Sequence, residues 1–164
     1  MKPNNRSFSA VRFAVFLTLS VTVMAVIFVF SAQNGEQSSA ASGFVSNFLR
    51  RVLSPVMPDE ALDFVLKYMR KIAHISIYFL LGLFAALSAS ELSRKTGRLF
   101  LCVFISWTVC MLYAVSDEFH QSFTAGREAS FRDVLIDSAG ALISVSLIGI
   151  ISFIKRKRVT KAWT

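Results

Sequence analysis

Four long stretches that are nearly free of charge constrain this chain more than any other feature. Residues 13–30 and 99–116 hold no charged side chain, residues 72–90 hold only His74, and residues 134–154 hold only Asp137. An α-helix of about 20 residues crosses ~30 Å of hydrocarbon, and a span in lipid must satisfy its own backbone hydrogen bonds. The sequence therefore predicts an all-α membrane protein with four transmembrane helices.

The four predicted spans leave little room for a separate soluble domain. With 54% hydrophobic and only 17% charged residues, the composition is unusual for a soluble protein of 164 residues. We therefore expect one membrane domain over residues 1–164. Cys102 and Cys110 lie eight residues apart in the third predicted span, too far apart on one helix to bond to each other, which excludes a disulfide framework.

The basic residues are distributed unequally over the segments between the predicted spans. Eleven of the 18 Lys and Arg residues, with one acid, lie in the N-terminal segment, in residues 91–98 and in the C-terminal tail. The side of the two longer loops holds the other seven basic residues and nine acids, counting Asp137 of the fourth span. Because Lys and Arg are enriched in cytoplasmic loops, we expect both termini in the cytoplasm and both longer loops outside.

The charge pattern has two other interpretations. The net charge of +8 could suggest nucleic acid, but the basic groups flank the spans, where anionic lipid headgroups explain them better. Lys2 and Arg6, the first apolar run and the Ser-Ala-Gln at 31–33 could also form a cleavable signal peptide, although the run is long for that. Cleavage would leave three spans.

The first outer loop, between the first two spans, is expected to hold two short helices. From Ser42, a good N-cap, apolar residues repeat at helical spacing with Arg50 and Arg51 beside them, which is typical of a helix in the headgroup layer. Pro55 and Pro58 then break the chain. Asp59 can begin a second helix that runs on toward the second span.

Polar side chains gather where the second span meets the outer face. Lys71, His74 and Tyr78 are spaced i, i+3, i+7 and so share one helical face, with Tyr78 ~10 Å deeper than Lys71. Singly, each has an ordinary interfacial explanation: the Lys reaches the headgroups, the Tyr belongs to an aromatic belt, and the His satisfies a hydrogen bond. Together they predict a polar stripe that faces the next cluster.

The second outer loop carries the densest set of polar side chains. If the third span continues as a helix, Asp117 and Gln121 align at i, i+4, with His120 close to both. Gly126 and Arg127 form an expected turn that returns a guanidinium toward this cluster. Where the fourth span begins, Asp133 and Asp137 form a second i, i+4 pair. Glu118, next to Asp117, is a further acid of this cluster.

Asp137 lies inside a predicted span. A carboxylate there costs about 2.5–3.5 kcal/mol, so it is expected to face protein and to be paired or protonated. An ion-pair network that ties the loop ends together is the structural alternative to a ligand or catalytic site. We expect no metal, because the chain has no His-Glu-x-x-His helix and no cysteine ligand near the acids, and no cofactor.

These motifs resemble the VanZ-like family of bacterial membrane proteins. The most specific motif is Asp117-Glu118-x-His120-Gln121. The other matching residues extend from the end of the first span to the fourth, and they are Ser31, Gln33, Ser38, Lys71, His74, Tyr78, Gly126, Arg127, Asp133 and Gly140. The family pattern often has Asn four residues after its final Asp, where this chain has Asp137. The resemblance implies a compact α-helical protein of the bacterial plasma membrane and brings no cofactor.

The resemblance also implies a link to the cell envelope. The family is named for a member associated with resistance to the glycopeptide antibiotic teicoplanin, and resistance can be a side effect of envelope metabolism. Our first hypothesis is a non-enzymatic binder of an anionic lipid or a lipid-linked cell-wall precursor, with glycopeptide as another partner. Lys71, Arg127 and Arg132 would hold phosphate, and Asp117, Glu118 and Asp133 would orient these cations.

Two further hypotheses remain open. An integral membrane hydrolase or group transferase would act on a lipid-linked substrate at the outer leaflet, with Asp117 or Glu118 as acid or base, His74 or His120 as its partner and Arg127 stabilising negative charge. No serine elbow or other diagnostic nucleophile supports it. A lipid or small-molecule transporter would use the intramembrane His74 and Asp137, and four helices would then require an oligomer for a wide path.

Overall fold

The computed structural model describes residues 7–32, 35–124 and 130–161. Every regular element in these ranges is an α-helix: α1 Ala10–Ser31, α2 Gly35–Leu53, α3 Asp59–Thr96, α4 Leu99–Gln121 and α5 Phe131–Lys161. Four helical segments are long and apolar enough to cross a membrane, and they are Ala10–Ser31, Lys71–Thr96, Leu99–Gln121 and Phe131–Arg158. The predicted all-α fold with four spans is confirmed, and each span is longer than its charge-free stretch.

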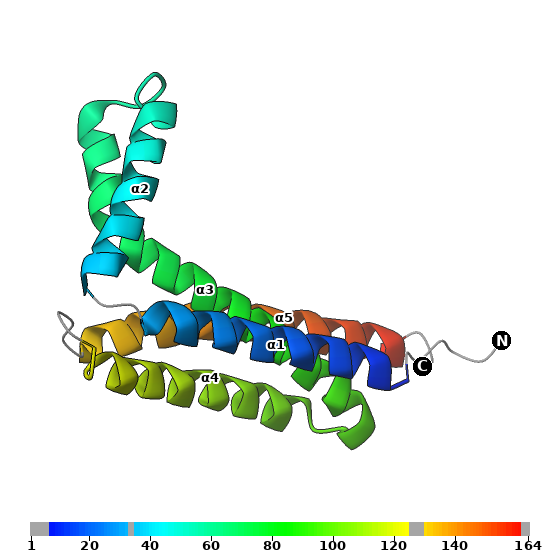
Figure 1. Cartoon of the computed structure of the whole chain (residues 1–164). Coiled ribbons are helices and arrows are strands. Elements are labelled where there is room, and N and C mark those ends of the chain that lie inside the picture. Colours follow the sequence, from blue (N-terminus) through cyan, green and yellow to red (C-terminus); the bar gives the residue numbers. More distant parts are fainter. Residues whose placement is uncertain (1–6, 33–34, 125–129, 162–164) are drawn as a thin grey trace.

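The four spanning segments lie side by side as a bundle, while α2 and the first part of α3 project from one end of it, across the bundle direction (Figure 1). The start of α1 and the end of α5 lie at the same end of the bundle, which we call the terminal end. We call the opposite end, where α1 and α4 finish and α5 begins, the loop end. At the terminal end Gly97 turns the chain from α3 to α4 with a φ of 73°, a left-handed value that favours glycine.

The segment between the first two spans contains two helices, as expected, but one boundary was wrong. The helix predicted to begin at Ser42 begins at Gly35, because no proline interrupts residues 35–42 and Ser is tolerated inside a helix. The second helix follows Pro58, with Asp59 and Glu60 in its first turn, where their charge favours the helix dipole. It continues without a break into the second span.

The helices α3 and α5 share the most extensive contact of the bundle. A Cβ at Gly82 of α3 would lie 2.7 Å from the carbonyl oxygen of Ala141 on α5, and one at Gly140 would lie 2.6 Å from that of Ile75. Small residues let helix backbones approach closely in a membrane, where lipid is as apolar as the helix surface. These glycines therefore set the spacing of the two helices that carry His74 and Asp137.

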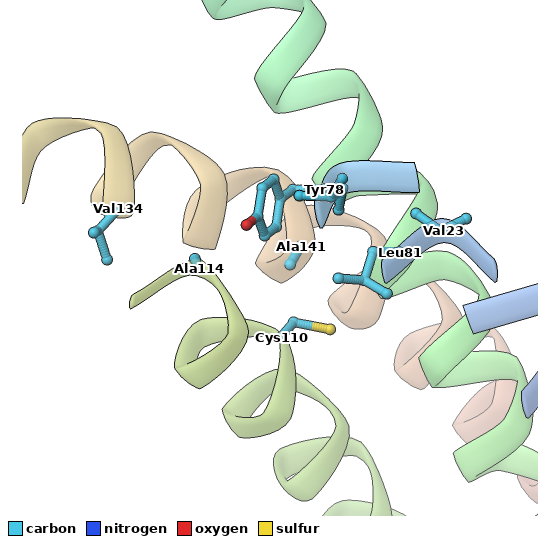
Figure 2. Packing of buried hydrophobic residues seen from close by; sticks show 8 residues of the cluster. Val23, Tyr78, Leu81, Cys110, Ala114, Val134 and Ala141 are labelled. Atoms are coloured by element: carbon cyan, nitrogen blue, oxygen red, sulfur yellow. The ribbon is translucent and has the colours of Figure 1, made fainter. Parts of the chain in front are cut away.

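The buried core of the bundle surrounds Tyr78, which has no exposed surface. Figure 2 shows its ring between α1, α4 and α5, with the hydroxyl oxygen pointing toward the side on which Ala114 and Val134 lie. The cluster of buried apolar residues around it consists of Val23, Ile27, Leu81, Cys110, Ala114, Val134 and Ala141. Tyr78 thus presents its one polar atom toward the loop end of the bundle.

Candidate functional site: a polar cluster at the loop end

The predicted stripe on α3 runs from the surface of the bundle into its core. Lys71 is exposed, the His74 side chain is 38% exposed, and Tyr78 is fully buried. Each step along the stripe is about one helical turn. The stripe therefore offers a cation at the surface, an imidazole at the boundary and a hydroxyl in the interior.

His74 pairs with Asp137, the carboxylate that the sequence places inside the fourth span. His74 Nδ1 lies 3.3 Å from Oδ1 and 3.4 Å from Oδ2 of Asp137. Asp137 is completely buried, so this contact offsets part of the cost of placing a carboxylate in hydrocarbon. Because Nδ1 faces the carboxylate, Nε2 is the ring nitrogen available to another group.

The acids at the end of α4 make two separate contacts. Gln121 Nε2 donates to Asp117 Oδ2 at 3.0 Å, as expected from their i, i+4 spacing. Glu118 Oε2 accepts a hydrogen bond from the backbone N–H of Ser130 at 2.9 Å. Ser130 directly precedes α5, so Glu118 joins the end of α4 to the start of α5.

The His120 ring makes a contact with α1 that its spacing did not reveal. Its ring stacks on Phe28 of α1, with ring centroids 4.7 Å apart and an interplanar angle of 24°, and it makes no hydrogen bond to Asp117 or Gln121 among the described residues. Phe28 lies in the last turn of α1, at the loop end, and its exposed ring contacts the imidazole. His120 therefore joins α1 to α4 in addition to presenting its ring nitrogens.

Several buried polar atoms at the loop end have no hydrogen-bond partner within the described part of the chain. They are the Tyr78 hydroxyl, Asp117 Oδ1, His120 Nε2, the Ser138 hydroxyl and Asp137 Oδ1, which has only the ion-pair contact with His74 described above. A buried polar group without a partner costs about 1–3 kcal/mol, and such groups are rare in proteins. Their concentration at one end of the bundle identifies this region as the candidate site.

The charge of the cluster is mainly negative. Asp117 and Asp133 lie close enough to Asp137 to act on it electrostatically, and His74 is the basic side chain that contacts Asp137. The cations expected to complete the site, Lys71 and Arg132, have exposed side chains at its edge. Arg127 and Gly126 lie outside the described residues.

The residues of the cluster can be compared with what a metal site requires. Zinc and harder divalent ions need three or more converging ligands. No group of three His, Cys, Asp or Glu side chains within residues 7–32, 35–124 and 130–161 has the geometry to hold a metal ion. The described cluster is instead arranged for hydrogen bonding, with carboxylate acceptors around a buried hydroxyl.

The family model described as VanZ/LLP1 matches residues 16–152. The chain belongs to the VanZ/LLP1 family. No curated protein and no solved structure has a significant match to it. The matched region contains the second and third spans in full, most of the first and fourth spans, and the whole polar cluster. This VanZ/LLP1 protein is therefore a multi-pass membrane protein whose loop-end acids lie within the matched region.

The terminal end of the VanZ/LLP1 bundle holds a second polar network, which sequence reasoning missed. Glu91 is buried, and its Oε1 lies 3.3 Å from Arg12 Nε and 3.4 Å from Arg94 Nε. Arg156 Nη2 donates to the Ser93 hydroxyl at 2.5 Å. The sequence signal for this network is Glu91, the single acid among the basic residues of 91–98. This network ties α1, α3 and α5 together.

Proposed function

We propose that this VanZ/LLP1 protein binds a lipid or lipid-linked cell-envelope component at the outer face of the bacterial plasma membrane. The loop end would face outward, which agrees with the excess of basic residues in the segments at the terminal end. The observation that carries the proposal is the concentration of buried polar atoms at the loop end, several of which make no hydrogen bond of good geometry within the described residues. Among them the Tyr78 hydroxyl and the Asp117 carboxylate lie close enough to interact with each other. A headgroup that brings its own hydroxyl or amine donors would satisfy the carboxylate oxygens.

The charges of the site favour a ligand with two chemically different parts. The carboxylates of Asp117 and Asp137 suit donors such as sugar hydroxyls or an amine. Lys71 and Arg132, exposed at the edge of the site, suit a phosphate. A phosphate-linked lipid that carries a sugar or amine satisfies both, and reduced access of a glycopeptide to such a lipid would connect the protein to teicoplanin resistance.

The proposal is tested by the lipids that remain bound to protein purified from bacterial membranes. Asp117→Asn keeps the shape of the side chain and removes its charge, and we expect it to lower the amount of the most enriched lipid about tenfold, since a hydrogen bond to a charged group contributes about 1.5–3 kcal/mol. Lipids are extracted and quantified by mass spectrometry.

The matched control is Glu91→Gln. Glu91 is as buried as Asp117, with relative exposures of 6% and 4%, but it lies at the opposite end of the bundle. This variant should retain the enriched lipid. Equal lipid content in both variants and in the wild type would contradict binding at the loop end.

The His74–Asp137 pair favours a second candidate function, hydrolysis of an ester in a lipid-linked envelope substrate. An imidazole held through Nδ1 by a carboxylate is the arrangement of a general base. His74 Nε2 would accept a proton from water as the water oxygen bonds to the carbonyl carbon or phosphorus, and the imidazolium would return that proton to the departing oxygen. Asp137 would orient the ring.

Hydrolysis and binding are distinguished by the His74→Gln variant. An amide can keep hydrogen bonds to Asp137 but cannot accept and return a proton. If the protein is a hydrolase, the enriched lipid should accumulate on this variant relative to the wild type. Unchanged lipid identity and amount would leave binding as the function of the site and reject hydrolysis.

A further inference from the structure

The bundle contains an apolar groove that is separate from the polar cluster. It lies between α1, α3 and α4, in the half of the bundle nearer the terminal end, and has a volume of about 230 Å³. Residues on its three walls include Leu17 and Val21 of α1, Ala85 of α3, and Ser106 and Val109 of α4. A dry cavity of about 150 Å³ already accommodates benzene, so the groove can hold a segment of an alkyl chain.

The groove is closed toward the loop end. Tyr113 of α4 donates a hydrogen bond of 2.6 Å from its hydroxyl to the carbonyl oxygen of Met24 on α1, which bridges the two walls. Leu81 and Cys110, at the same level, belong to the packed core around Tyr78 (Figure 2). A chain in the groove therefore lies on the terminal-half side of this bridge, away from the polar cluster, and can reach it between exposed lining residues such as Val21 and Val109.

Two cations stand at the terminal end of the groove. Lys95 follows the lining residue Leu92 by three positions on α3 and so shares a helical face with it; its Nζ lies over the Phe8 ring, 5.7 Å from the centroid. Arg98 is the N-cap residue directly before α4, four positions before the lining residue Cys102. Both cations therefore lie about one turn beyond the lining. Neither forms an ion pair with an acid among the described residues.

We propose that the groove binds one acyl chain of an anionic phospholipid from the leaflet at the terminal end, with the phosphate near Lys95 and Arg98. The groove lies within spanning segments, where the surrounding medium is hydrocarbon. Its lining is apolar, which suits an alkyl chain, and the positive charges at its end complement an anionic headgroup. The site is independent of the loop-end function and stands at the opposite end of the bundle.

The acyl-chain part of the proposal is tested with matched valines on α4. Val109 lines the groove and is 49% exposed, whereas Val115 is 48% exposed and is not among the lining residues. Val109→Trp should fill the groove and reduce binding of dioleoyl-phosphatidylglycerol about tenfold, measured by native mass spectrometry in detergent. Val115→Trp should bind as the wild type does. Equal binding by both variants would overturn the groove as the site.

The position of the lipid headgroup is tested with two double variants, each of which reverses two positive charges. Lys95→Glu with Arg98→Glu should lower the preference for dioleoyl-phosphatidylglycerol over dioleoyl-phosphatidylcholine about tenfold, because each basic residue contributes to attraction of anionic lipid. Lys155→Glu with Arg158→Glu makes the same charge change on exposed residues of α5 and should preserve the preference. Loss of preference in both pairs, or in neither, would overturn the assignment of the headgroup.

Discussion

Asp137 illustrates what one residue can demand of a membrane bundle. Its side chain is fully buried, and His74 is the ionisable partner that contacts it. Removing one partner of a buried pair leaves the other uncompensated. The imidazole of His74 is 38% exposed, so it can meet solvent or ligand while it satisfies the carboxylate.

The coupling of these two residues can be measured by a double-mutant cycle. His74→Ala leaves Asp137 without its partner and should lower the apparent free energy of unfolding in detergent by about 1–3 kcal/mol. Asp137→Asn alone should change it little, since an amide oxygen can still accept from the imidazole. The double variant should recover at least half of the loss. Additive losses would show that the two residues are not coupled.

Glu118 has a structural contact that complicates its use as a catalytic candidate. Its bond to the Ser130 backbone N–H satisfies a donor beside the first turn of α5, where an unpaired N–H would otherwise remain. The sequence identified Glu118 as part of an acidic cluster but could not assign this bond, because the contact joins residues on opposite sides of the second outer loop. A loss of function in a Glu118 variant must therefore be read together with its stability.

At the scale of elements, the close approach of α3 and α5 positions the site. Gly82→Ala would place a Cβ 2.5 Å from the Ser144 hydroxyl and 2.7 Å from the Ala141 carbonyl oxygen. We expect a loss of about 1–3 kcal/mol in stability, because the two backbones must separate. Thermal unfolding in detergent measures it.

Gly43→Ala is the matched control for this variant. No atom lies within 4 Å of a Cβ added at Gly43 of α2, and alanine favours a helix over glycine by about 0.5–1 kcal/mol. The control should be neutral or slightly stabilising. A similar loss in both variants would show that close packing of α3 on α5 is not the cause.

The elements were largely predictable, and their mutual contacts were not. The length of the uncharged stretches predicted the four spans, because a helix of about 20 residues that crosses lipid carries few charged side chains. Helical spacing predicted that Lys71, His74 and Tyr78 share a face and that Asp117 meets Gln121. The pairing of His74 with Asp137 joins residues 63 positions apart and depends on how α3 and α5 are rotated, which spacing within one helix does not reveal.

The molecule as a whole has two polar ends with different compositions. The loop end gathers carboxylates around partly unsatisfied atoms, whereas the terminal end neutralises its buried acid, Glu91, with Arg12 and Arg94. Within the described residues, more of the buried polar atoms without a hydrogen bond lie at the loop end, while Arg12 Nε at the terminal end is such an atom but lies 3.3 Å from Glu91 Oε1. This asymmetry is the reason for assigning the ligand to that end.

The orientation of the bundle gives a prediction for the whole molecule. Cysteines introduced at Asn47 and Thr124 should react in intact cells with a maleimide that cannot cross membranes, whereas one at Thr96, the last residue of α3, should react only after the membrane is opened. The native Cys102 and Cys110 are buried and serve as the background measurement. Labelling of position 96 from outside would reverse the orientation.

The central claim, that the loop-end cluster binds a ligand, is tested most directly by comparing two tyrosine hydroxyls. Tyr113 donates its hydroxyl proton to the Met24 carbonyl oxygen, whereas the buried Tyr78 hydroxyl has no hydrogen-bond partner among the described residues. Each Tyr→Phe variant is measured for thermal stability and for the lipid that remains bound after purification. We predict that Tyr78→Phe lowers bound lipid about tenfold and lowers stability by less than Tyr113→Phe does, because the Tyr78 hydroxyl lies near the Asp117 carboxylate without a hydrogen bond of good geometry. Tyr113→Phe should lower stability by about 1 kcal/mol and leave bound lipid unchanged. Unchanged lipid in Tyr78→Phe would contradict the claim.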